Sequence, residues 1–153
     1  MIIFLERKLM ASLDAYYRKE HAQEPVIVAS EEAVDVLIDE LMSGPVDHNL
    51  AQVHSLDRPL LPSGFPDHEV MVGASAGRNI GIIAFVDGGV GNIFSVGMPD
   101  TEPATAYFLA GHPMEYPENC EVPIALVREA LKEFLLTGGN VPTCVDWKRS
   151  DLW

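Results

Sequence analysis

Five histidines and two cysteines are the side chains in this sequence that most readily bind metals or act as bases and nucleophiles. They are His21, His48, His54, His68, His112, Cys120 and Cys144. The histidines form no His-x-His or His-Glu-x-x-His pattern, the cysteines form no Cys-x-x-Cys pair, and no Gly-x-Ser-x-Gly motif marks a nucleophile. The spacing therefore predicts no catalytic residue, no metal site and no cofactor. It favours two reduced, partly buried thiols, with a disulfide or a catalytic thiol as the alternative.

Two glycine-rich segments, residues 73–77 and 88–91, have the composition of phosphate-binding loops. Neither contains the Gly-Lys-Ser/Thr sequence of such a loop, and neither is followed by a predicted helix. Both lie between predicted strands, so they are predicted to be hairpin turns.

A group of acidic and aromatic side chains near the middle of the C-terminal half is the most suggestive candidate for a binding site. Its members are Asp100, Glu102, Tyr107, Glu115, Tyr116, Glu118 and Glu121. Carboxylates beside amphipathic aromatic rings are typical of a protein interface in which charge guides association and aromatic residues anchor the partner. We predict a partner-binding surface here; the alternative is a solvated loop with its tyrosines in the core.

The formal net charge of −13 is unevenly distributed along the chain. Between residues 20 and 127 there are seventeen Asp or Glu residues, and the only cations are Arg58 and Arg78. Nucleic acids and anionic membranes are bound through Lys and Arg, so this composition argues against direct binding to either. It favours a partner with a basic surface, with simple solubility as the alternative explanation.

The segment 122–147 is the most clearly specified structural element. Pro123 suits the first turn of a helix. Apolar residues at helical spacing follow it, namely Ile124, Val127, Leu131, Phe134 and Leu135. Gly138 and Gly139 are predicted to end the helix, and residues 143–147 to form a strand.

Residues 9–18 alternate between apolar and polar side chains and predict a half-buried strand, with residues 25–28 as its hairpin partner. Ser30 is a good N-cap for an amphipathic helix that runs to Leu41 and ends at Ser43-Gly44-Pro45.

A third strand at 49–56 is predicted next, then a Pro-rich connection at 58–66 whose Leu60, Leu61 and Phe65 need cover. This connection is either a binding loop or a cover for the core. A meander follows at 69–74, 79–86 and 92–96, then a strand at 105–109 and a polar loop at 111–121.

The predicted fold class is α+β: a curved, mainly antiparallel sheet of about six to eight strands with two amphipathic helices. Residues 10–153 are predicted to form a single globular domain, and residues 1–9 a leader or flexible N-terminal segment. No apolar run approaches the roughly 18 residues of a membrane span, so a cytoplasmic location without membrane contact is expected.

Several local motifs together resemble the family-one immunity proteins of bacterial polymorphic toxin systems. They are Tyr16-Tyr17, Glu24-Pro25-Val26, Gly64-Phe65-Pro66-Asp67-His68-Glu69, Val122-Pro123, Val127-Arg128-Glu129-Ala130, Phe134-Leu135, Thr137-Gly138-Gly139, Pro142-Thr143, Val145 and Trp147. The resemblance implies a cytosolic antitoxin that binds a toxin encoded beside it and has no catalytic residues. Family members often accompany toxins of the nucleic-acid deaminase superfamily.

The predicted function is therefore that of an immunity protein that binds and occludes a cognate toxin domain. The resemblance and the charge together favour a nucleic-acid deaminase, whose active-site surface is basic because it binds nucleic acid. Two alternatives stay open. One is an acidic scaffold subunit for another basic protein. The other is a small ligand-binding domain or enzyme with a pocket under the Pro-rich connection.

Overall fold

The two helices form where the sequence places apolar residues at helical spacing. In the computed structural model, which describes residues 11–97 and 105–152, helix α2 spans Glu31–Ser43 and helix α3 spans Ile124–Leu136. Ser30 caps α2 as predicted, because its side chain accepts a hydrogen bond from the Ala33 N–H at 3.1 Å. Pro123 precedes α3 in an extended conformation rather than joining its first turn.

Seven strands form the antiparallel sheet in the order β10-β6-β5-β4-β3-β1-β2, and the short β9 pairs with the beginning of β5. Their bounds are β1 Leu13–Tyr16, β2 Val26–Val28, β3 Leu50–Ser55, β4 His68–Ser75, β5 Ile80–Asp87, β6 Gly91–Ser95, β9 Val122–Pro123 and β10 Trp147–Arg149. Two short 3-10 helices, η1 (Lys19–Ala22) and η2 (Val46–His48), lie in the connections. The α+β class and the mainly antiparallel sheet are confirmed.

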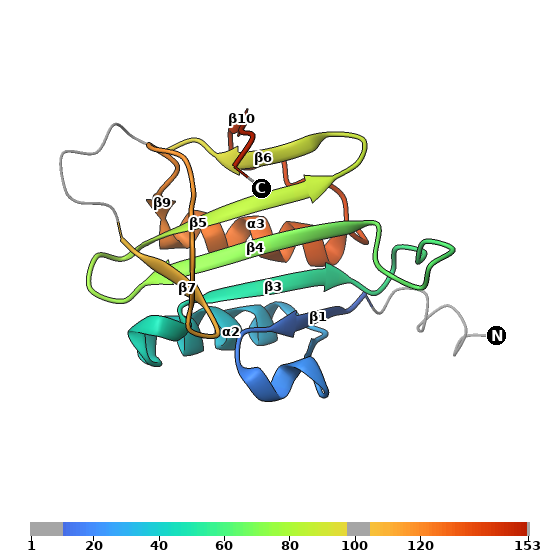
Figure 1. Ribbon diagram of the computed structural model, residues 1–153, viewed down its shortest axis with the longest axis horizontal. Coiled ribbons are helices and arrows are strands. Elements are labelled where there is room, and N and C mark those ends of the chain that lie inside the picture. Colours follow the sequence, from blue (N-terminus) through green and yellow to red (C-terminus); the bar gives the residue numbers. More distant parts are fainter. Residues whose placement is uncertain (1–10, 98–104, 153) are drawn as a thin grey trace.

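Both helices cover the same face of the sheet (Figure 1). The main core lies between them and the sheet, and it includes the fully buried Leu37, Ile38, Phe85 and Phe134. Burial of such side chains contributes roughly 1.5–3 kcal/mol each. This layer therefore supplies most of the apolar contact that holds the fold together.

A separate hairpin of β7 (Tyr107–Leu109) and β8 (His112–Met114) crosses the opposite face of the sheet (Figure 1). A second apolar cluster lies beneath it and includes Leu50, Met71, Phe94 and Tyr107. The prediction of an unstructured polar loop at 111–121 is therefore wrong for its first part, because His112–Met114 pairs with β7.

The predicted strand at 143–147 is also wrong for most of its length. Thr143 and Cys144 donate their backbone N–H groups to the Glu133 carboxylate of α3, at 2.7 and 3.2 Å. These bonds turn the chain toward the helix, and pairing with β6 begins only at Trp147. Of the predicted strand at 9–18, residues 9 and 10 lie outside the described residues, and the described part is a strand only over Leu13–Tyr16.

Within residues 11–97 and 105–152, no helix has both the length and the apolar character needed to cross a lipid bilayer.

Candidate functional site

The structure gives the members of the predicted acidic and aromatic surface different environments. Asp100 and Glu102 fall outside the described residues. Glu115 and Glu118 are exposed, while Tyr116 is half-buried. These three residues are the accessible part of the predicted group in the described chain.

Tyr107 lies inside the protein, with 1% of its surface exposed. Its ring packs on Gly73 of β4, where a Cβ atom would lie 2.6 Å from Tyr107 Cδ1. Its hydroxyl donates a hydrogen bond to Glu121 Oε2 at 2.8 Å, and burial raises its pKa well above the ordinary value. Tyr107 therefore secures the hairpin to the sheet and does not present itself to a partner.

Glu121 is also an internal group, since only 8% of its side chain is exposed. Its carboxylate accepts the Tyr107 hydroxyl and lies 3.7 Å from Arg78 Nη1. The alternative of core tyrosines under a solvated loop therefore holds for Tyr107, while Glu121 is buried beside it instead of lying in the solvated loop. The continuous apolar run in β5, from Ile82 to Val86, was the sequence signal for a second buried face of the sheet, because such a strand is typically buried on both faces.

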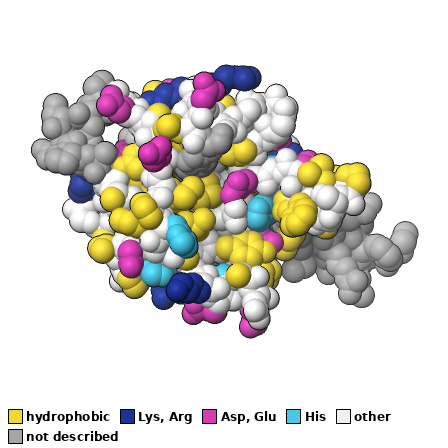
Figure 2. All heavy atoms as spheres, in the orientation of Figure 1, with side chains coloured by type: hydrophobic (Ala, Val, Ile, Leu, Met, Phe, Trp, Pro, Cys, Tyr) yellow, Lys and Arg dark blue, Asp and Glu magenta, His cyan; other side chains and the backbone are white. Residues whose placement is uncertain are grey.

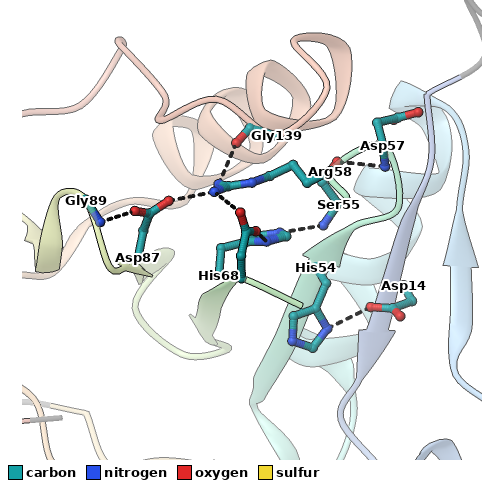
Figure 3. A network of polar contacts seen from close by, with 10 residues as sticks. Asp14, His54, Ser55, Asp57, Arg58, His68, Asp87, Gly89 and Gly139 are labelled. Carbon is teal, nitrogen blue, oxygen red and sulfur yellow. Dashed lines mark hydrogen bonds and ion pairs between the residues drawn. The ribbon is translucent and has the colours of Figure 1, made fainter. Parts of the chain in front are cut away.

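Arg58 organises a polar network that the sequence did not indicate (Figure 3). Its Nη2 donates to Asp67 Oδ2 at 3.0 Å and to Asp87 Oδ2 at 2.7 Å, and its Nη1 donates to the Gly139 carbonyl at 3.2 Å. The guanidinium also lies 5.9 Å from the centre of the Phe85 ring. One side chain thus joins the β3–β4 connection, the end of β5 and the turn after α3.

The network fits the turn that follows α3. Gly139 has φ +101°, and a Cβ atom there would lie 2.6 Å from Arg58 Cδ. A glycine is therefore required both by the backbone conformation and by the close approach of the arginine. The two glycines predicted to end the helix also make room for Arg58.

One cation, Arg58, faces two carboxylates in this network, those of Asp67 and Asp87. The hydrogen bond from Arg58, followed by the Gly89 N–H, holds the pKa of Asp87 below its ordinary value. Partial burial would raise the pKa of Asp67, but hydrogen bonds from His68 and Arg58 hold it below its ordinary value. Both carboxylates are therefore ionised at neutral pH and accept bonds from the same cation.

His68 completes the network from β4. Its Nε2 accepts the Ser55 N–H at 2.8 Å, so the proton is assigned to Nδ1, which lies 2.9 Å from Asp67 Oδ1. Burial lowers the pKa of His68, with Arg58 adding to this effect and Asp67 opposing it. A neutral imidazole with both nitrogens bonded, and only 1% of its side chain exposed, positions the loop and cannot act as an accessible base.

The β3–β4 loop, residues 56–67, exposes apolar side chains beside this network. Leu60, Leu61 and Phe65 are 61%, 46% and 70% exposed. Figure 2 shows hydrophobic side chains gathered on this loop, while Lys and Arg lie mainly at the margins of the same face. The expected cover for these side chains is absent among the described residues.

The cysteines do not form a disulfide with each other. Burial raises the pKa of Cys120 to about 12 and of Cys144 to about 11, so both thiols are protonated at neutral pH and poorly nucleophilic. In the part of the chain that the structure describes, no three His, Cys, Asp or Glu side chains are grouped as metal ligands would be.

Comparison with known proteins identifies the family. The family model described as "Immunity protein Imm1" matches residues 22–149, and no curated protein matches the chain. A solved structure described as a hypothetical protein from Neisseria gonorrhoeae is similar at 10% identity and a TM-score of 0.41, covering 87% of this chain and 90% of that chain. Because the family model spans most of the sequence, from η1 to the end of β10, this chain belongs to the Imm1 family of immunity proteins.

Proposed function

We propose that this protein acts in the cytoplasm of the bacterium that produces it, where it binds the toxin domain encoded beside it and covers that domain's active site. The observation that carries the proposal is the Imm1 family match over residues 22–149. Immunity proteins of polymorphic toxin systems protect the producer from its own toxin, as the sequence resemblance implies. Protection by binding requires a stable surface of suitable shape and charge.

The environments of His68, Cys120 and Cys144 fit a role in binding better than a role in catalysis. The buried His68 has both nitrogens occupied, and burial keeps the thiols of Cys120 and Cys144 protonated. A protein that inhibits by occlusion needs no reactive group of its own. Such a protein distinguishes its own toxin from other proteins by surface contacts that only this toxin can make.

The charge of the chain supports a toxin with a basic active-site surface, and a nucleic-acid deaminase has such a surface. An enzyme acting on a nucleic-acid base needs a cationic channel for the phosphate backbone. An anionic protein of net charge −13 is attracted to that channel and excludes the substrate. The alternative function is that of an acidic scaffold subunit for another basic protein. The same negative charge supports this alternative.

Co-expression with the neighbouring toxin domain tests the function. Cells that produce the toxin domain alone are expected to die, and cells that also produce this protein are expected to grow. The two proteins should also co-purify from these cells. Continued cell death together with failure to co-purify would refute the proposal.

Exposed acidic side chains on the hairpin side are expected to guide association. Exchanging Glu115 and Glu118 for lysine should slow association with the toxin domain roughly tenfold at low salt and flatten its dependence on salt. Stopped-flow mixing across salt concentrations measures this. The free energy of unfolding should change by under about 0.5 kcal/mol for each exposed position.

The matched control replaces Glu20 and Glu24 with lysine, because these exposed residues lie near η1 and give the same change in net charge. Association of this control should slow less. An equal loss for both variants would mean that only the total charge matters and that the contact surface lies elsewhere.

A further inference from the structure

We infer that the β3–β4 loop is a pre-shaped apolar anchor that enters an apolar pocket on the toxin domain, and that lysine or arginine residues border this pocket. The inference rests on the proposed function and names a contact surface for it. It adds an anchoring contact at the end of strands β3 and β4 where residues 56–67 project (Figure 1), while the acidic hairpin side keeps its expected role of guiding association.

Exposed apolar side chains are concentrated in this loop. Among the described residues, ten large hydrophobic side chains are exposed, and four of them lie within ten consecutive positions of the loop. These four are Leu56, Leu60, Leu61 and Phe65. Single exposed hydrophobic residues are ordinary, but four of them on one loop are typical of an interaction site. Phenylalanine is among the residues enriched at the core of protein interfaces, and the leucines beside Phe65 extend the apolar surface around it.

The loop holds its shape without a partner. Leu61 N–H donates to the Phe65 carbonyl at 2.8 Å, and Gly64 N–H donates to the Leu61 carbonyl at 2.8 Å. Three prolines, at positions 59, 62 and 66, restrict the backbone further. The loop therefore loses little conformational freedom on binding, and more of the contact energy appears as affinity.

The Arg58 network secures both ends of this loop. Arg58 lies at its start and Asp67 at its end, and the ion pair between them at 3.0 Å closes the base. Bonds from Arg58 to Asp87 and to Gly139 tie that base to β5 and to the turn after α3. The network thus stabilises a loop whose own apolar side chains add little to the core.

The charge around the loop identifies the partner's chemistry. Arg58 is the only cation in the loop, and its guanidinium bonds inward to two carboxylates. Asp57 is exposed at the start of the loop and adds negative charge to its outer surface. A basic rim around the partner's apolar pocket complements this arrangement, whereas a nucleic acid or an acidic protein would be repelled.

The test replaces Leu60 and Phe65 together by glutamine and measures binding to the purified toxin domain by calorimetry. Loss of two anchors should raise Kd by roughly 100-fold or more, because a single anchor residue typically accounts for about 30-fold. The matched control replaces Val36 and Leu136, which are 56% and 62% exposed on α2 and α3, by glutamine. This control should bind within about threefold of the parent.

A second measurement uses the unaltered protein. Hydrogen exchange of the backbone amides of residues 60–65 should slow in the complex, while exchange at the exposed side of α3 should not change. Slower exchange in the loop supports the inference. Unchanged exchange there, or parental affinity of the Leu60 and Phe65 variant, overturns it and leaves the proposed function standing. Failure of the parent to bind the toxin domain overturns both.

Discussion

Replacing Phe134 with alanine is expected to lower the free energy of unfolding by about 3–5 kcal/mol. Phe134 is fully buried, and its ring centre lies 5.8 Å from that of Phe85 and 5.7 Å from that of His68. Removing the ring leaves a cavity between α3 and the sheet and removes the apolar wall beside the His68 imidazole. The loss should appear as a midpoint lower by roughly 10 °C in thermal unfolding.

Leu136→Ala is the control for this change. Leu136 lies two residues further along the same helix with 62% of its surface exposed, so its replacement should cost under about 0.5 kcal/mol. Chemical denaturation of the parent and both variants measures the difference. If Phe134→Ala were as stable as Leu136→Ala, the assignment of this helix face to the core would be wrong.

Replacing Arg58 with alanine should lower the free energy of unfolding by about 2–3 kcal/mol, below the roughly 3–5 kcal/mol of a fully buried pair. The change leaves Asp67 and Asp87 facing each other without a cation and the Gly139 carbonyl without its donor. The side chains of Arg58, Asp67 and Asp87 are 19%, 31% and 18% exposed, so water screens this loss only in part.

Arg128→Ala provides the comparison, because Arg128 also pairs with two carboxylates and is 22% exposed. Its partners Asp35 and Asp39 are 39% and 66% exposed, so the loss should stay near 0–1 kcal/mol, as is usual for surface pairs. Urea unfolding of the two variants measures this contrast. Equal losses would mean that the Arg58 network contributes no more than a surface ion pair.

The Arg58 effect should also depend on pH. The pKa values of Asp67 and Asp87 are lowered in the folded protein, so their contribution is present above the unfolded-state pKa and is lost as pH falls through the folded-state values. The difference in stability between the parent and Arg58→Ala should therefore shrink in acid, once both carboxyls are protonated. It should be constant only where both carboxyls are ionised and His68 is neutral in both proteins, because Arg58 also lowers the pKa of His68.

Local sequence patterns were sufficient for the helices and for the strands that cross the centre of the sheet. The spacing of Val34, Leu37, Ile38 and Leu41 matches the buried face of α2, and the Ser30 cap lies where it was expected. The α+β fold class follows from these elements. Periodicity works for the two helices because each buries one face against the main core, whereas β5 is marked by a continuous apolar run because both of its faces are buried.

The failures come from contacts between residues far apart in the sequence. Glu133 reorients residues 143 and 144 by hydrogen bonds from another element, and nothing in the local pattern of that segment reveals this. The burial of Tyr107 depends on a hairpin that lies over the second face of the sheet. Arg58 reaches partners 9, 29 and 81 residues away, so no spacing rule detects its network.

The candidate site was likewise predicted in part, since its charge follows from the sequence but the exposure of its residues does not. Charge distribution was readable from the sequence and supports a basic partner. It did not separate the internal Glu121 from the exposed Glu115 and Glu118, because accessibility depends on tertiary packing. From the sequence, the Pro-rich connection was recognised as a segment that is either a binding loop or a cover for the core. The bonds of Arg58, which close the base of the loop, are visible only in the structure.

Titration of toxin activity with this protein tests the central claim, which is protection by stoichiometric binding. The purified toxin domain is assayed on its own substrate, which the proposal takes to be a nucleic acid, with increasing amounts of the immunity protein. Activity should fall linearly and reach zero at one equivalent. Full activity at several equivalents would contradict the proposal, and complete inactivation by a small fraction of an equivalent would indicate an enzyme instead of a binding protein.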